Sequence, residues 1–117
     1  MATVWLLWGR PGMSGGKLVR DKVPQLIRSG GAEPVVRVAG DREYRGLLRA
    51  KLVEEVEEFL ASEEPEELAD VLEVVLALSE DLGVGCAGLE ELRAVKAGER
   101  GGFGQRVVWS GNRGPGG

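Results

Sequence analysis

Apolar residues recur every three or four positions along two stretches in the middle of the chain, which is the spacing of amphipathic helices. The first stretch predicts a long helix that has Asp41 as its N-cap and ends at about Ser62. The second begins at Pro65, a residue favoured at the first helical position, and ends at about Leu82. Because only two residues separate them, the two helices are predicted to pack as an antiparallel hairpin. Their apolar stripes are Tyr44, Leu47, Leu48, Leu52, Val56, Phe59 and Leu60 in the first, and Leu68, Val71, Leu72, Val75, Leu78 and Leu82 in the second.

Weaker patterns lie on either side of this hairpin. Pro24 fits the first turn of a short helix over 23–29, and a further helix is predicted over 88–96, followed by a glycine-rich loop over 98–104. Short extended pieces over 35–38 and 106–109 predict at most one small hairpin of strands. The predicted fold class is therefore mainly α, a helical bundle in which the antiparallel helix hairpin carries an acidic site.

Composition and local patterns set the expected domain limits and location. Residues 17–109 are predicted as one domain, residues 1–16 as a poorly ordered extension, and residues 110–117, with four glycines and a proline, as a disordered tail. No stretch approaches the roughly 20 apolar residues of a membrane span, and the apolar run at 4–8 is too short for a signal peptide. The single cysteine, Cys86, permits no internal disulfide, suits the reducing cytoplasm and is predicted to be a small buried side chain.

The charge pattern changes the picture of the helical region. Between Leu52 and Leu92 there are fourteen acidic residues and no Lys or Arg, although the formal net charge of the whole chain is only −4. A helix without opposite charges four residues apart repels itself, so this segment is expected to attract cations. The absence of His and the single Cys exclude His-ligated zinc and thiolate clusters, which leaves an oxygen-ligated ion, Mg²⁺ or Mn²⁺. The acidic balance also argues against a general nucleic-acid binder.

Helical spacing places four of these acids at the edges of the predicted buried faces. Glu55 and Glu58 are three residues apart on the first helix, and Glu67 and Asp70 are three apart on the second. In an antiparallel hairpin the two pairs reach similar heights, so their carboxylates are predicted to converge on one patch. Glu54 is predicted to point outward. Each acid alone would be interpreted as a solvated surface residue, but the set, with no base nearby, is a candidate metal site.

Four stretches of the chain, taken in order, resemble a known enzyme family. They are KLVRDKVP (17–24), KLVEEVEEF (51–59), EELADVLEV (66–74) and RGGF (100–103). The spacing Glu-x-x-Glu followed by Glu-x-x-Asp is similar to the metal motif of the all-α nucleoside triphosphate pyrophosphohydrolases, which include MazG-like enzymes and phosphoribosyl-ATP pyrophosphohydrolase. The four stretches resemble one MazG-like branch and cover about residues 17–108. Only eight residues separate Glu58 from Glu67, fewer than in many members, so less loop is expected over the site.

The resemblance implies an activity and a set of site residues. Mg²⁺ would be held by Glu55, Glu58, Glu67 and Asp70, and a metal-activated water would attack a nucleoside triphosphate between the α and β phosphates. The products would be a nucleoside monophosphate and pyrophosphate, and the expected role is the removal of non-standard nucleotides. Glu54 and Glu55 are the candidate catalytic residues, with Glu54 as acceptor of the water proton; a solvated role for Glu54 is equally open.

Basic residues on both sides of the acidic segment are candidate phosphate ligands, namely Lys17, Arg20, Lys22, Lys96, Arg100 and Arg106. Lys96 and Arg100 are favoured because they flank the glycine loop, although solubility alone explains any single one and the loop equally fits an ordinary turn. Two other functions stay open: the phosphoribosyl-ATP pyrophosphohydrolase of histidine biosynthesis, and a helical binding or oligomerisation module without catalysis. The hairpin alone buries too little for a stable core, so a homodimer or higher homo-oligomer is expected.

Overall fold

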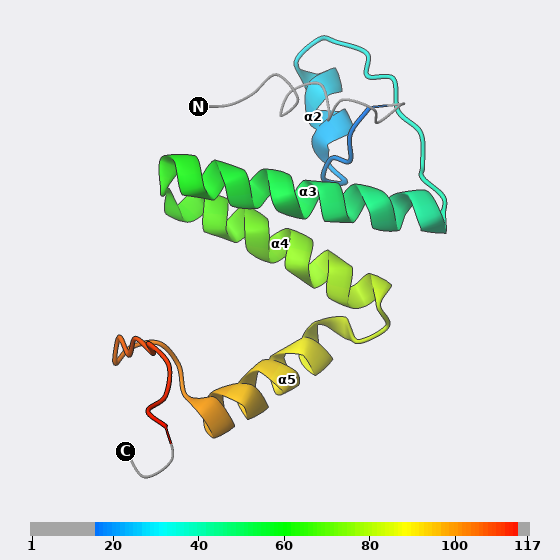
Figure 1. Ribbon diagram of the computed structural model, residues 1–117. Coiled ribbons are helices and arrows are strands. Elements are labelled where there is room, and N and C mark those ends of the chain that lie inside the picture. Colours follow the sequence, from blue (N-terminus) through cyan, green and yellow to red (C-terminus); the bar gives the residue numbers. More distant parts are fainter. Residues whose placement is uncertain (1–15, 115–117) are drawn as a thin grey trace.

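The computed structural model describes residues 16–114, and within that range the chain forms four helices and no strand (Figure 1). The helices are α2 (Val23–Ser29), α3 (Asp41–Ser62), α4 (Pro65–Asp81) and α5 (Gly85–Arg100). The prediction of a mainly α chain is therefore confirmed. Most of the predicted N-terminal extension (residues 1–15) and the end of the predicted tail (residues 115–117) lie outside the described residues. No helix of the described range is both long and apolar enough to cross a membrane.

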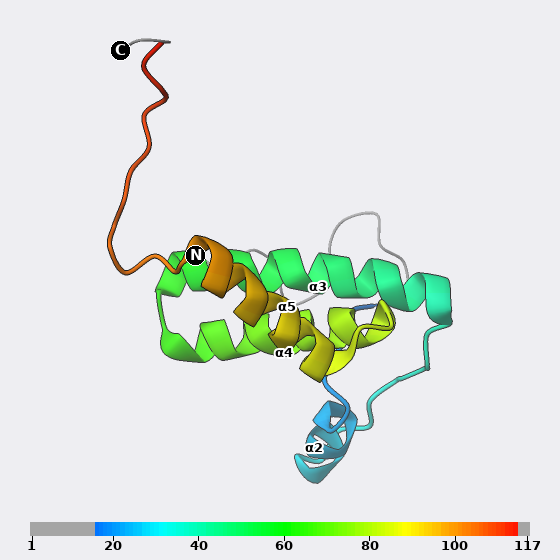
Figure 2. The ribbon, with the colours of Figure 1, turned by 90° about the horizontal axis from the view of Figure 1, so that it is seen from below.

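The two long helices, α3 and α4, run antiparallel and side by side, and their contact is the most extensive between helices of the described chain (Figures 1 and 2). α3 is capped at its C-terminus by Glu63, whose φ of 57° lies in the left-handed region and whose N–H donates to the Phe59 carbonyl at 2.7 Å. The next residue leads directly into α4. The N-cap of α3 is Gly40 rather than the predicted Asp41, which instead begins the helix, where its negative charge complements the helix dipole.

α5 follows a tight turn and diverges from α4 toward its own C-terminal end (Figure 1). The turn uses the positive φ angles of Gly83 (80°) and Gly85 (79°), a backbone conformation that glycine adopts without steric cost. The Ser79 hydroxyl donates to the Gly85 carbonyl at 2.8 Å and ties the turn to α4. α5 begins before the predicted residue 88 and continues past residue 96, so Gly98 is helical rather than part of a loop.

Three parts of the chain that the sequence predicts to be paired or buried lie at the surface. Residues 35–38 and 106–109 form no strand, and Val35 and Val38 are 102% and 97% exposed. An isolated pair of strands without a packed face is marginal in water, which accounts for the missing hairpin. Cys86, in the first turn of α5, is exposed, so the prediction of a buried thiol is wrong. The main neighbour of α5 is α4, which leaves the other sides of that turn open.

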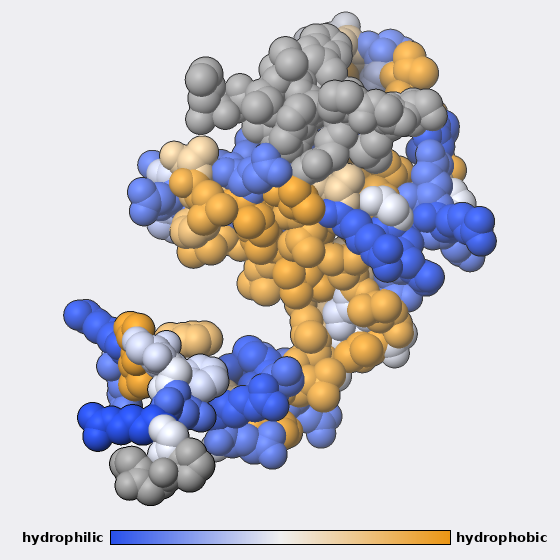
Figure 3. Space-filling view, viewed as in Figure 1, coloured by the Kyte–Doolittle hydropathy of each residue, from blue (hydrophilic) through white to orange (hydrophobic). Residues whose placement is uncertain are grey.

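The apolar core of the described chain is small. Among the described residues, only two apolar side chains are buried, Leu48 of α3 at 2% exposure and Val74 of α4 at 8%. The radius of gyration is 19.0 Å, against about 13 Å for a compact domain of this length, and the extended chain after α5 contributes to this value (Figure 2). Several stripe residues that the sequence predicts to be buried are instead exposed, and Figure 3 shows apolar surface over the α3–α4 pair that reaches the turn into α5. We give the name apolar helix surface to the exposed apolar residues of these helices, namely Val53, Val56, Leu60, Leu68, Leu72, Leu82, Leu92 and Val95.

Candidate functional site

Three carboxylates from the two long helices lie together on one side of the α3–α4 pair. Glu55 of α3 and Glu67 and Asp70 of α4 each offer one carboxylate oxygen, and these oxygens all lie within 4.8 Å of one another. The three-residue spacing of Glu67 and Asp70 puts both on one face of α4, and the antiparallel packing brings that face to Glu55. We call these three residues the acidic cluster. Carboxylate oxygens in such a group are the ligands that Mg²⁺ and Mn²⁺ prefer.

Two oxygens of the acidic cluster are buried without a hydrogen-bond partner. They are Oε2 of Glu55, a residue that is 7% exposed, and Oε2 of Glu67. Burial raises the pKa of Glu55, the charges of Glu58 and Asp70 add to this effect, and Lys51 opposes it. Burial likewise raises the pKa of Glu67, with further contributions from the nearby charges of Asp70 and Glu55. A buried acceptor without a partner is costly, so a divalent cation here would supply what the two oxygens lack.

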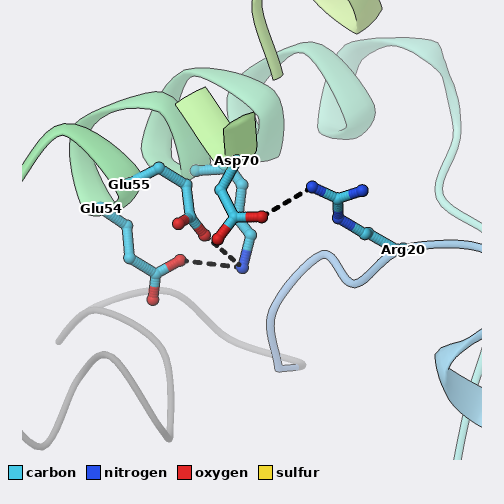
Figure 4. Close-up of polar contacts among 5 residues, drawn as sticks. Arg20, Glu54, Glu55 and Asp70 are labelled. Carbon is cyan, nitrogen blue, oxygen red and sulfur yellow. Dashed lines mark hydrogen bonds and ion pairs between the residues drawn. The ribbon is translucent and has the colours of Figure 1, made fainter. Parts of the chain in front are cut away.

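Two basic side chains partly neutralise the acids. Lys51 Nζ lies 3.2 Å from Glu54 Oε2 and 3.4 Å from Glu55 Oε1, and Arg20 donates from Nη2 to Asp70 Oδ1 at 2.7 Å. Figure 4 shows Arg20, in the segment before α2 (residues 16–22), reaching toward Asp70 beside Glu54 and Glu55. The expectation that no base lies near the acids is therefore wrong. Lys51 comes directly before the base-free window, and its spacing of three and four residues from the two glutamates was visible in the sequence.

Two acids take positions that differ from their prediction. Glu58 does not belong to the acidic cluster; it lies half-buried one turn along α3 and acts on Glu55 through its charge. The predicted convergence of four carboxylates is thus reduced to three. Glu54, predicted to point outward, is only 7% exposed, and Lys51 holds its carboxylate beside that of Glu55. The carboxylate of Glu54 therefore faces Lys51, one turn earlier on the same helix, rather than open solvent.

A cavity of about 420 Å³ opens beside the acidic cluster, between the segment before α2 and the α3–α4 pair. Of the candidate phosphate ligands, Arg20 and Lys22 line the cavity, whereas Lys17, in the same segment, is exposed and does not line it. Lys96, Arg100 and Arg106 do not line it, because α5 diverges from the α3–α4 pair. The full lining is Leu18, Val19, Arg20, Asp21, Lys22, Tyr44, Leu48, Lys51, Glu55, Asp70, Glu73, Val74 and Ala77.

Protons and divalent cations are expected to compete for the acidic cluster. The pKa values of Glu55 and Glu67 are raised above the ordinary value of 4.5. Without metal, the contribution of these two groups to the free energy of unfolding is therefore greatest below pH 4.5, and it falls as the pH rises through the raised pKa values. A metal binds the deprotonated forms, so Mg²⁺ should raise the thermal unfolding midpoint more at about pH 8 than at about pH 5. Calorimetric scans with MgCl₂, against NaCl at matched ionic strength, measure this. An equal effect of Mg²⁺ at both pH values would contradict it.

Comparison with known proteins adds one relative. An uncharacterized protein of Mycolicibacterium smegmatis is 51% identical over 47 residues, which are 40% of this chain and 48% of that protein. The chain thus spans about half the length of the curated relative it matches. No protein-family model and no solved structure matches the chain. The geometry of the acidic cluster and its cavity therefore carries the functional argument.

Proposed function

We propose that this protein is a Mg²⁺-dependent nucleotide pyrophosphohydrolase that converts a nucleoside triphosphate and water into a nucleoside monophosphate and pyrophosphate. The observation that carries the proposal is the acidic cluster, in which Glu55 and Glu67 each keep a buried oxygen without a partner. A site built only for ion pairs would have satisfied these oxygens with donors. The resemblance of the four sequence stretches to MazG-like enzymes supports the same activity, and from it we propose the removal of non-standard nucleotides in the cytoplasm as the role.

The residues of the site divide into a metal-binding set and a proton-handling set. Glu55, Glu67 and Asp70 would hold Mg²⁺ or Mn²⁺, with Glu58 on the adjacent turn available if its side chain rotates. When bound, the ion supplies charge neutralisation for the phosphates and lowers the pKa of a bound water. Glu54 lies beside the cluster and is our candidate for accepting the proton of the attacking water.

The basic side chains of the site have two expected roles. Lys51 lowers the pKa of Glu55 and so favours the charged carboxylate that metal binding needs. Arg20 and Lys22 line the cavity from the segment before α2, where they would contact the phosphates. We retain Lys17, Lys96, Arg100 and Arg106 only as weaker candidates, since none of them lines the cavity.

The proposed activity is tested with purified protein, MgCl₂ and a set of nucleotides that includes standard and damaged nucleoside triphosphates and phosphoribosyl-ATP. We expect stoichiometric release of pyrophosphate and a nucleoside monophosphate from at least one triphosphate, and loss of this release on chelation of the metal. Hydrolysis confined to phosphoribosyl-ATP would favour the histidine-biosynthesis alternative. Release of orthophosphate instead of pyrophosphate would contradict cleavage between the α and β phosphates.

One structural feature favours a second candidate function, a helical binding module without catalysis. Lys51 and Arg20 already neutralise part of the acidic charge, so the acids could serve as ion pairs between elements of the fold. The Arg20–Asp70 pair is half-exposed, and such pairs contribute about 0–1 kcal/mol, which is little against the cost of grouping the three carboxylates of the acidic cluster. The absence of pyrophosphate from every nucleotide tested would favour this module.

We propose that the protein forms a homodimer through the apolar helix surface. The described chain buries only Leu48 and Val74 as apolar side chains and leaves exposed stripes on three consecutive helices. Contiguous apolar surface of this kind marks an interaction site, and a second copy offers a matching apolar surface through two-fold symmetry. The dimer would thus complete the core that one chain lacks.

A further inference from the structure

The cavity beside the acidic cluster changes in chemical character along its length. Its wall on α3 consists of Tyr44, Leu48, Lys51 and Glu55, which follow one another at intervals of four, three and four residues and so share one face of the helix. The first two are aromatic and aliphatic, the third is a cation and the last belongs to the acidic cluster. The two ends of this stripe are separated by about 16 Å along the helix axis.

The wall on α4 shows the same order. Counted from the turn that joins the two helices, Asp70 and Glu73 come first, and Val74 and Ala77 follow. Because α3 and α4 are antiparallel, the charged ends of both walls lie toward the turn and the apolar ends lie away from it. The two helical walls of the cavity are therefore charged toward the turn and apolar away from it.

The segment before α2 closes the cavity from a third side. Leu18 and Val19 contribute apolar side chains, and Arg20 holds the segment against Asp70 at the charged end through the 2.7 Å contact. This contact comes from residues that are fifty positions apart, so only the folded chain creates the third wall. A cavity of about 420 Å³ also falls within the range of about 300–1,000 Å³ that small-molecule sites occupy.

We infer that this cavity binds the nucleoside part of a nucleotide, with the base against Tyr44, Leu48, Val74 and Ala77 and the phosphates toward Lys51, Arg20 and the acidic cluster. The inference rests on the proposed function, since the acidic cluster and its metal would hold the phosphates. Beyond the proposed function, we infer that the apolar end of the cavity allows the protein to distinguish a nucleotide from a bare polyphosphate. A planar base stacks well on an aromatic ring, and Tyr44 is the aromatic residue of the lining.

The inference predicts that changes at the apolar end affect nucleotide binding alone. The probes are α,β-methylene nucleoside triphosphates carrying adenine, guanine, cytosine or thymine, and tripolyphosphate, each titrated by calorimetry in the presence of Mg²⁺. Tyr44→Ala should weaken binding of the best nucleotide by about fivefold or more, as expected for loss of one stacking contact, and should leave tripolyphosphate binding unchanged. Tyr44→Phe, which keeps the ring, should retain wild-type affinity for both probes.

A second pair of variants tests the cavity by filling it. Ala77→Phe places a ring in the apolar end and should weaken nucleotide binding but not tripolyphosphate binding, whereas Ala69→Phe, at an exposed position of the same helix, should change neither. Circular dichroism identifies any variant that loses its helices, and such a variant is set aside. The other of the two variants, Tyr44→Ala or Ala77→Phe, then tests whether the cavity binds the nucleoside. Equal effects on both probes, or none on either, would overturn the nucleoside site and leave the proposed metal-dependent activity standing. If no probe binds to wild-type protein, the site and the proposed function both fail.

Discussion

Replacing Glu67 with glutamine is expected to reduce pyrophosphate release by at least about 100-fold while leaving the helical circular dichroism spectrum intact. Glu67 contributes one of the three oxygens of the acidic cluster, and an amide carries no charge with which to hold a divalent cation. Asp70→Asn should have the same effect. The measurement is steady-state release of pyrophosphate with Mg²⁺, at a nucleotide concentration that saturates wild-type protein.

Stability measurements separate loss of a metal ligand from loss of structure. Because burial and nearby charges raise the pKa of Glu67, its neutral replacement should leave the metal-free unfolding midpoint unchanged or higher at neutral pH. The increase of the midpoint caused by Mg²⁺ should disappear in the same variant. Glu66→Gln is the matched control, since Glu66 is the exposed neighbour in the first turn of α4 and lies outside the acidic cluster. Full activity of Glu67→Gln or Asp70→Asn would remove that residue from the proposed ligand set.

Changing Leu68 and Leu72 together to glutamine is expected to convert a dimer into a monomer. Wild-type protein should show twice the chain mass of 12.5 kDa by light scattering at micromolar concentration. Both leucines are more than half exposed in the single chain, and burial of a leucine contributes about 1.5–3 kcal/mol. Four substituted side chains in a two-fold interface should therefore raise the dimer dissociation constant by at least about 100-fold.

Glutamine substitutions and a matched control separate an effect on the dimer interface from an effect on helix stability. Glutamine has nearly the helix propensity of leucine and adds no charge to a segment that already repels itself. Val38→Gln is the control, because Val38 is 97% exposed and lies outside the helices. If the double variant unfolds, the wild-type protein still tests for a dimer, because the unfolding midpoint of a dimer rises with protein concentration. A monomeric wild-type mass with a concentration-independent midpoint would rule out the dimer.

The helix boundaries show how much of this fold is local. α2, the end of α3 and the start of α4 all lie where the sequence predicts them, because proline and the Glu63-Glu64 turn act on their immediate neighbours. The C-terminal helix is longer than its pattern indicates, and the two extended segments remain unpaired. The length of a helix end and the pairing of an extended segment both depend on which other element lies beside it. The residues of the segment alone do not specify that neighbour.

The candidate site shows the same division at the level of single side chains. The sequence by itself determined the four helices, the three-residue spacing of the acids and the shortage of bases among them, because these depend on composition and helical periodicity. Only the tertiary structure decided that Glu58 stays outside the cluster and that Arg20 reaches Asp70, whereas the Lys51–Glu54 ion pair follows from three-residue spacing on one helix. The physical reason is that helical periodicity sets the angles between side chains on one helix, whereas the packing of α3 on α4 and on the segment before α2 sets which of those side chains meet.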